Sequence, residues 1–332
     1  MNEHSHEALF QKGKVLTEQA RTQPGEEAKR LYSQAEQTFK EAVKIKPDDY
    51  ETFYQWGNAL AERANINLGE EADSLYAEAG EKYEQVIKLK PDQHEALYNW
   101  AIILSNQASL RHEGEADRFF MLTGEKYRQA LKIKPGLHEA LNNWGNVLLF
   151  RARTKMENGN ENEADRLFTQ ACEKYQQALK IKPDKFEALF NWGNALSDQA
   201  SLKDESEADR LLKLAGKKFQ KILTIKSDEV DALDSWGNAL LEQAKSKSPK
   251  GKIKLLQKAQ EKFEQAESIS PGAGSYGMAC VMALLGQEAE CRQWLEKGRE
   301  MDSLPDEDIM MDDPNLENIC ESEWFDEFIE QL

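Results

Sequence analysis

The chain has 332 residues, of which 31% are charged and 40% hydrophobic, so it can bury the core of one repeat array or of two ordinary domains. No apolar run approaches a membrane-spanning length, and the opening stretch MNEHSHEALF lacks the basic start and apolar block of a secretory signal. The net charge is −17, but residues 302–332 hold twelve acidic and no basic residues, so the remainder is nearly balanced. Neither part has the basic face typical of nucleic-acid-binding proteins, and we expect a cytoplasmic protein without a nucleic-acid partner.

The cysteines and histidines show no metal-binding or redox spacing, so we expect reduced thiols, no bound metal and no cofactor. The four cysteines are Cys172, Cys280, Cys291 and Cys320. His4 and His6, near the start of the chain, are expected to lie in a loose tail rather than in a metal site.

A repeat of about 44 residues runs through most of the chain. The triplet Trp-Gly-Asn, or a close variant, recurs with spacings of 44, 44, 48 and 44 residues. Its tryptophans are Trp56, Trp100, Trp144, Trp192 and Trp236. A proline closes five of the copies in step with them, at Pro47, Pro91, Pro135, Pro183 and Pro271. Internal repeats of this length indicate a solenoid built from similar units.

Each copy is predicted to form two helices. In the first, Trp192, Leu196 and Ala200 follow one another in steps of four and share one apolar face, which predicts that all three are core residues. Gly193 would let a neighbouring helix come close. In the second helix, Leu31 and Phe39 belong to a similar stripe, and a proline then prevents continuation. No segment shows strand alternation, so the expected fold is all-α.

The pattern of small and large apolar residues resembles the tetratricopeptide repeat (TPR) family over most of the chain. The residues that carry the resemblance are Leu97, Ala101, Tyr127, Ala130 and Pro135. It implies a right-handed superhelical solenoid of antiparallel helix hairpins. The usual unit has about 34 residues, so roughly ten extra residues must be shared between the two helices of each hairpin, adding about 7.5 Å to each.

The repeat pattern predicts three regions. Six long repeats occupy residues 1–273, divided at about 6–49, 50–93, 94–137, 138–185, 186–229 and 230–273. Residues 274–301 form a shorter terminal hairpin. The acidic segment 302–332 ends in a helix whose stripe is Phe325, Phe328, Ile329 and Leu332. This helix either caps the stack or serves as a recognition element or lid.

The sequence predicts a non-enzymatic protein. It contains no phosphate-binding glycine loop, no nucleophile motif and no metal spacing. Its carboxylates recur once per repeat at helix starts, as at Glu95, Glu139 and Glu187, where they complement the helix dipole.

The expected function is therefore that of a protein interaction scaffold. In TPR solenoids the first helices line the concave groove, so the resemblance places a row of aromatic and asparagine side chains there. The candidate peptide-binding residues are Tyr54, Asn58, Tyr98, Asn99, Asn143, Asn146, Phe190, Asn191, Asn194 and Asn238. An asparagine amide both donates and accepts, so a ladder of them could hold an extended main chain. The alternative is that these asparagines are a family feature without a ligand.

Four acidic residues, Glu18, Glu62, Asp198 and Glu242, are predicted to make the groove negative and to favour a neutral or basic peptide. Co-chaperone TPR proteins bind a C-terminal carboxylate with lysine and arginine side chains. Lys14 is the only basic residue at the predicted groove positions, which argues against such a clamp here. A second function remains open, that of a self-assembling structural protein, and the oligomeric state is undetermined. The lysine-rich stretch 244–254 is either a solvated turn or a contact for an acidic partner.

Overall fold

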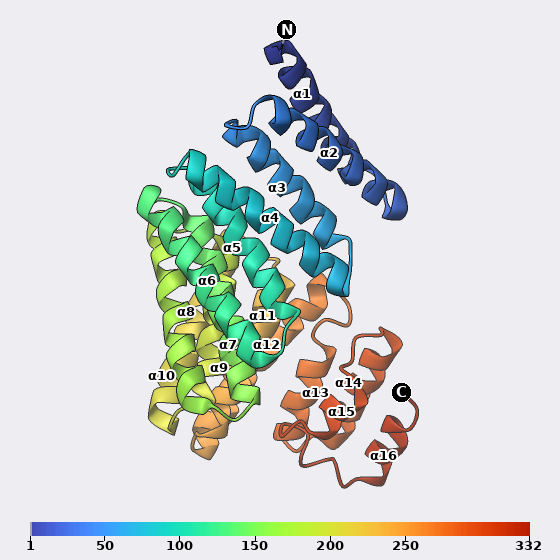
Figure 1. Cartoon of the computed structure of the whole chain (residues 1–332). Coiled ribbons are helices and arrows are strands. Elements are labelled where there is room, and N and C mark those ends of the chain that lie inside the picture. Colours follow the sequence, from blue (N-terminus) through green and yellow to red (C-terminus); the bar gives the residue numbers. More distant parts are fainter. Residues whose placement is uncertain (1) are drawn as a thin grey trace. The chain divides into compact units, whose positions relative to one another are not determined.

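The computed structural model describes residues 2–332, and all regular structure in that range is helical (Figure 1). The chain divides into two compact units, residues up to 147 and residues 148–332, with the boundary inside one helix. Consecutive helices pair as antiparallel hairpins, so the predicted all-α solenoid of helix hairpins is confirmed.

The helices of the first unit are α1 (Asn2–Arg21), α2 (Gly25–Ile45), α3 (Tyr50–Asn65), α4 (Gly69–Leu89), α5 (His94–Ser109), α6 (Glu113–Ile133) and the start of α7 (His138–Glu157). Those of the second unit continue with α8 (Glu161–Ile181), α9 (Phe186–Ala200), α10 (Glu205–Ile225), α11 (Val230–Lys245), α12 (Pro249–Ile269), α13 (Ser275–Leu284), α14 (Glu288–Glu300), α15 (Glu307–Met311) and α16 (Glu323–Ile329). The expected loose tail around His6 is wrong, because this residue lies in α1 with its Nε2 3.1 Å from Thr52 Oγ1. The side chain of His4 lies outside the described residues.

Glycines of the first helices receive the large aromatic rings of the second helices. A methyl group added at Gly193 in α9 would lie 2.5 Å from Cε1 of Phe219 in α10, and one added at Gly237 would lie equally close to Phe263. Both rings are wholly buried. The predicted close approach at Gly193 is therefore confirmed, and its neighbour is an aromatic ring.

The tryptophans lie beside this core rather than within it. Trp192 is half-buried, so the prediction that it is a full core residue is wrong in part. The ammonium group of Lys218 lies 3.4 Å from the centroid of its ring, and Lys126 lies 3.5 Å from that of Trp100. Each lysine therefore covers the outer face of a tryptophan and makes a cation–π contact.

A polar clamp joins the end of a first helix to the start of the second helix of the preceding repeat. The buried side chain of Gln199 in α9 donates from Nε2 to Asp165 Oδ1 of α8 at 2.8 Å, and Lys203 Nζ lies 2.6 Å from the other carboxylate oxygen. Equivalent clamps join Gln107 and Arg111 to Asp73, and Gln243 and Lys247 to Asp209. The glutamine and aspartate side chains are buried or half-buried. These bonds therefore supply hydrogen-bond partners to polar groups that packing removes from water.

The acidic segment after residue 301 packs on the terminal hairpin. Phe325 and Phe328 of α16 are buried in one cluster with α13 and α14, whereas Leu332 is 44% exposed and does not join them. Tyr276 of α13 donates from its hydroxyl to Asp313 Oδ2 at 2.7 Å, which ties the segment down further. In Figure 1 this segment lies against α13 and α14. Burial raises the pKa of Cys291 in this cluster to about 12, so it is an unreactive thiol.

Candidate peptide-binding face

In the first unit, the predicted asparagines bond to other residues of the chain. Asn99 of α5 donates from Nδ2 to Asn58 Oδ1 of α3 at 2.9 Å and to the Tyr54 hydroxyl at 3.2 Å. The buried Tyr83 of α4 donates from its hydroxyl to the same Asn58 oxygen at 2.8 Å. This four-residue network links three helices and two repeats, so its asparagines hold the repeats together.

The same bond recurs one repeat further along. Asn143 of α7 donates from Nδ2 to the hydroxyl of Tyr98 in α5 at 2.9 Å. The Tyr98 ring lies 6.0 Å, centroid to centroid, from that of the buried Tyr127. In both of these repeats, the asparagine just before the tryptophan therefore reaches back to the tyrosine of the preceding repeat. Asn146, on the same helix, is exposed.

The second unit keeps a buried tyrosine in α8, Tyr175, but phenylalanines take this position in its next two repeats. The central aromatic residues of α10 and α12 are Phe219 and Phe263, which carry no hydroxyl to bond an asparagine. Asn194 of α9 is half-buried and has no hydrogen-bond partner among residues 2–332. Asn238 of α11 is exposed and donates to Asp234 Oδ2 at 3.0 Å. Within the described part of the chain, the partner of Asn238 is therefore a near neighbour on its own helix.

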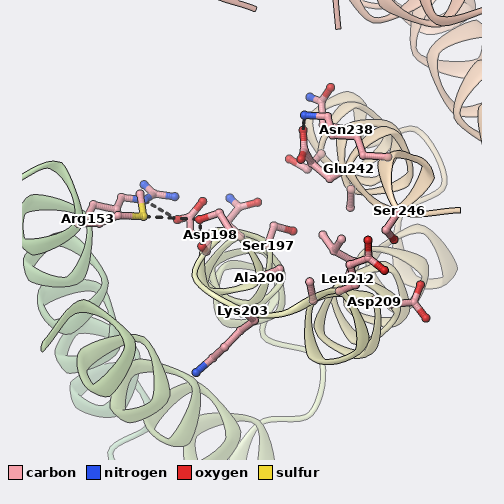
Figure 2. Close-up of a pocket in the computed structure, with 18 residues that line it drawn as sticks. Arg153, Ser197, Asp198, Ala200, Lys203, Asp209, Leu212, Asn238, Glu242 and Ser246 are labelled. Atoms are coloured by element: carbon pink, nitrogen blue, oxygen red, sulfur yellow. Dashed lines mark hydrogen bonds and ion pairs between the residues drawn. The ribbon is translucent and has the colours of Figure 1, made fainter. Parts of the chain in front are cut away.

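A cavity of about 520 Å³ opens between α9, α10 and α11 of the second unit (Figure 2). Asn194, Ser197, Ser235 and Asn238 line it. The Ser197 hydroxyl is buried and makes no hydrogen bond within the part of the chain that the structure describes. The cavity thus brings together two of the predicted asparagines with polar groups whose bonding capacity is unused.

Phe190 and Asn191 lie at the start of the same helix, and both are half-buried. The Phe190 ring stacks on Phe186 at 6.1 Å and meets Phe219 edge-on at 6.2 Å. Phe190 therefore extends the core toward the face and leaves part of its ring to solvent.

The four acidic residues predicted to make the face negative all have basic partners. Arg21 of α1 binds Glu62 through two nitrogens, at 2.8 and 2.6 Å, and also binds Glu18. In the second unit Arg153 donates to Asp198 at 2.7 Å, a pair visible in Figure 2, and the acidic Glu242 pairs with the lysine three residues on. These basic partners stand eight residues after the glycine of their repeats, and the acidic residues alone did not predict them. The preference for a neutral or basic peptide stays a prediction.

One carboxylate on this face does lack a cation. Asp234 occupies the position that holds Phe190 in the preceding repeat, and burial raises its pKa to about 6, with a further contribution from Asp231. Among the described residues, Asp234 accepts a hydrogen bond from Asn238 and from no other side chain.

Residues 2–332 show neither a cluster of metal-ligating side chains nor a candidate membrane-spanning helix. That range contains no group of three or more His, Cys, Asp or Glu side chains that could hold a metal ion. No helix within it is both long enough and apolar enough to cross a bilayer.

Comparison with solved structures defines the class as tetratricopeptide repeat proteins. The C-terminal part of a TPR repeat-containing protein from Cytophaga hutchinsonii is 11% identical over 90% of this chain and 98% of that solved part, with a TM-score of 0.59. The S. pombe nuclear import adaptor Nro1 is 12% identical over 82% of this chain and 98% of its own, with a TM-score of 0.53. A Parabacteroides merdae TPR protein gives 13% identity, coverage of 95% and 98%, and a TM-score of 0.50. No curated protein sequence matches the chain.

A family model gives the narrower assignment. The model of the plant-specific mitochondrial import receptor subunit TOM20 matches residues 31–139 and again residues 132–229, which together exceed half of the chain. The chain belongs to this family. The two matched ranges overlap at residues 132–139.

Proposed function

We propose that the protein is a non-enzymatic interaction scaffold that binds an extended partner segment on the first helices of its second unit. The observation that carries the proposal is the cavity between α9, α10 and α11, where Asn194 presents an amide that no described residue uses. An amide of this kind can donate to a partner carbonyl and accept from a partner N–H, so it can hold a main chain irrespective of sequence.

The face combines apolar and polar contacts. Phe190 lies four residues before the cavity-lining Asn194 on α9 and leaves part of its ring exposed, and the exposed Asn238 lines the cavity from α11. An aromatic edge buries an apolar partner side chain, while the asparagines bond the backbone. Asn58, Asn99 and Asn143 already bond within the chain, so the proposal assigns partner binding to Asn194 and Asn238 of the second unit.

Membership of the import-receptor family suggests which class of protein segment the face binds. A mitochondrial import receptor recognises proteins bound for that organelle, and mitochondrial targeting segments are amphipathic, rich in arginine and poor in acidic residues. A chain of net charge −17 attracts such segments at long range, and Asp234 adds an unpaired carboxylate near the cavity. We therefore infer a basic amphipathic segment as the ligand.

The test uses a fluorescently labelled basic amphipathic peptide and anisotropy titration. Asn194→Ala is expected to weaken its binding about ten-fold, the loss of one or two hydrogen bonds. Asn99→Ala is the matched control, because it removes an asparagine of the same repeat pattern that bonds within the chain. Unchanged binding by Asn194→Ala, or an equal loss in both variants, would count against the proposed face.

We also infer a place at the mitochondrial surface, which refines the expected cytoplasmic location and rests on the family alone. Cell fractionation checks it. A chain that stays wholly in the soluble fraction, and never accompanies mitochondria, would contradict the inference.

A further inference from the structure

A second hollow in the second unit has the opposite charge character. It measures about 670 Å³ and lies between the second helices α10 and α12, with Trp236 of α11 in its lining. We call it the basic groove, because its charged lining consists of five lysines and one acidic residue, Glu261. The lysines are Lys213, Lys217, Lys247, Lys258 and Lys262. Such an excess of cations is unexpected in a chain of net charge −17.

Three of the five lysines have partners. Lys213 and Lys247 each lie 2.6 Å from a carboxylate oxygen of Asp209. Lys262 lies 4.8 Å from the centroid of the Trp236 ring.

The other two lysines are uncompensated. Lys217 and Lys258 are exposed, and neither forms an ion pair or hydrogen bond with any residue in the range 2–332. They come from the two helices that form opposite walls of the groove, α10 and α12. A ligand between the walls could therefore meet a cation on each side.

The repeat pattern shows that the fold does not require these lysines. Lys217 stands two residues before the central aromatic of its helix, Phe219. The same register holds glutamate in four other repeats, at Glu81, Glu125, Glu173 and Glu261. The register of Lys258 holds glutamate at Glu78. Since the same fold accommodates the opposite charge, packing does not require the change of sign in α10.

We propose that the basic groove binds an acidic segment of a partner protein, with its carboxylates on Lys217 and Lys258 and an apolar side chain against Trp236 and Leu255. The lining of the groove includes leucines between the lysines, which suits side chains of a peptide better than a free phosphate. The lysines line a hollow rather than a projecting ridge, so a flat membrane surface fits less well. The proposed acidic segment has the opposite charge to the proposed targeting segment. Its site is also a different one, between the second helices α10 and α12.

The test compares two double variants of the full chain with equal changes of charge. Lys217→Glu with Lys258→Glu removes the unpaired cations of the groove. The control is Lys12→Glu with Lys40→Glu, two exposed lysines of the first unit without an ion pair among the described residues. The probe is a labelled synthetic peptide of glutamates interspersed with leucines, and its companion has glutamine in place of glutamate. Phosphatidylserine vesicles and inorganic pyrophosphate serve as further arms.

We expect the glutamate peptide to bind, and the groove variant to lose at least about ten-fold in affinity while the control loses less than about two-fold. Binding should weaken with added salt, as for any exposed charge contact. Lys217→Gln with Lys258→Gln should give an intermediate loss, and it keeps the test decisive if the glutamate variant does not fold, since glutamines occupy both registers in the first repeat, at Gln37 and Gln34.

Several results would overturn the proposal: no binding of the glutamate peptide, equal binding of the glutamine peptide, or equal losses in the two glutamate variants. Vesicle binding that only the groove variant loses, without peptide binding, would assign the groove to a membrane surface. Competition by pyrophosphate without peptide binding would assign it to a small anion.

Discussion

Replacing Asn99 by alanine is expected to loosen the junction between repeats of the first unit. The variant loses the bonds from Nδ2 to Asn58 Oδ1 at 2.9 Å and to the Tyr54 hydroxyl at 3.2 Å. A net 0.5–1.5 kcal/mol for each hydrogen bond gives about 1–3 kcal/mol. Both acceptors are half-buried, so water can replace part of what is lost, and we expect about 1–2 kcal/mol. For a unit of this size that corresponds to a fall in melting temperature of about 2–8 °C.

The assay is urea unfolding followed by circular dichroism. Because a repeat array can unfold in steps, hydrogen exchange of peptides from α3 to α5 should accompany it. The control is Asn194→Ala, whose amide has no partner among the described residues and whose stability should stay within about 0.5 kcal/mol of the wild type. The reasoning fails if Asn99→Ala is as stable as the wild type, or if both variants are destabilised equally.

Three further outcomes follow from the packing and the charges. Urea titrations should show that Phe219→Ala costs about 3–5 kcal/mol but Trp192→Ala only about 1–3 kcal/mol, because the first ring is wholly buried and the second half-buried. Gly237→Ala should cost about 1–3 kcal/mol, since the added methyl would lie 2.5 Å from Phe263 Cε1; an unchanged melting temperature would mean that this ring can shift. Burial raises the pKa of Asp234 from 3.8 to about 6, so its ionised form destabilises the folded state above that pH, and the penalty vanishes as the carboxylate is protonated in both states below its unfolded pKa. Asp234→Asn should therefore stabilise the chain at neutral pH by about 1–3 kcal/mol but not at about pH 3, which melts at the two pH values would compare.

The sequence predicted the asparagines of the candidate site but not which of them bond within the chain. Asn58 and Asn194 have the same place after their glycines and nearly the same neighbours in sequence. Their roles differ because Tyr83 offers a hydroxyl to the first, whereas Phe219 offers none to the second. This difference was present in the sequence, but its meaning depended on knowing that the central aromatic of the second helix lies beneath the asparagine.

The pairing of the acidic residues on this face also depended on the tertiary structure. Glu62 suggested a negative face when counted with the other acidic residues of its register. Its partner, Arg21, is 41 residues away in sequence and on a different helix, so no local pattern connects the two. The buried glutamines of the clamps, such as Gln199, were not predicted for the same reason. Each of them recurs with an aspartate in the second helix of the preceding repeat.

The sequence by itself determined the fold class, because a helical period, a glycine opposite a large aromatic and a closing proline act over a few residues or within one hairpin. It also determined the close contact at Gly193, which follows from the absence of a side chain there. The tertiary structure alone decided which amides and charges remain for a partner. Bonds such as that from Asn99 to Tyr54 join residues 45 apart across a repeat junction, and only the stacking of helices brings such groups within hydrogen-bonding distance.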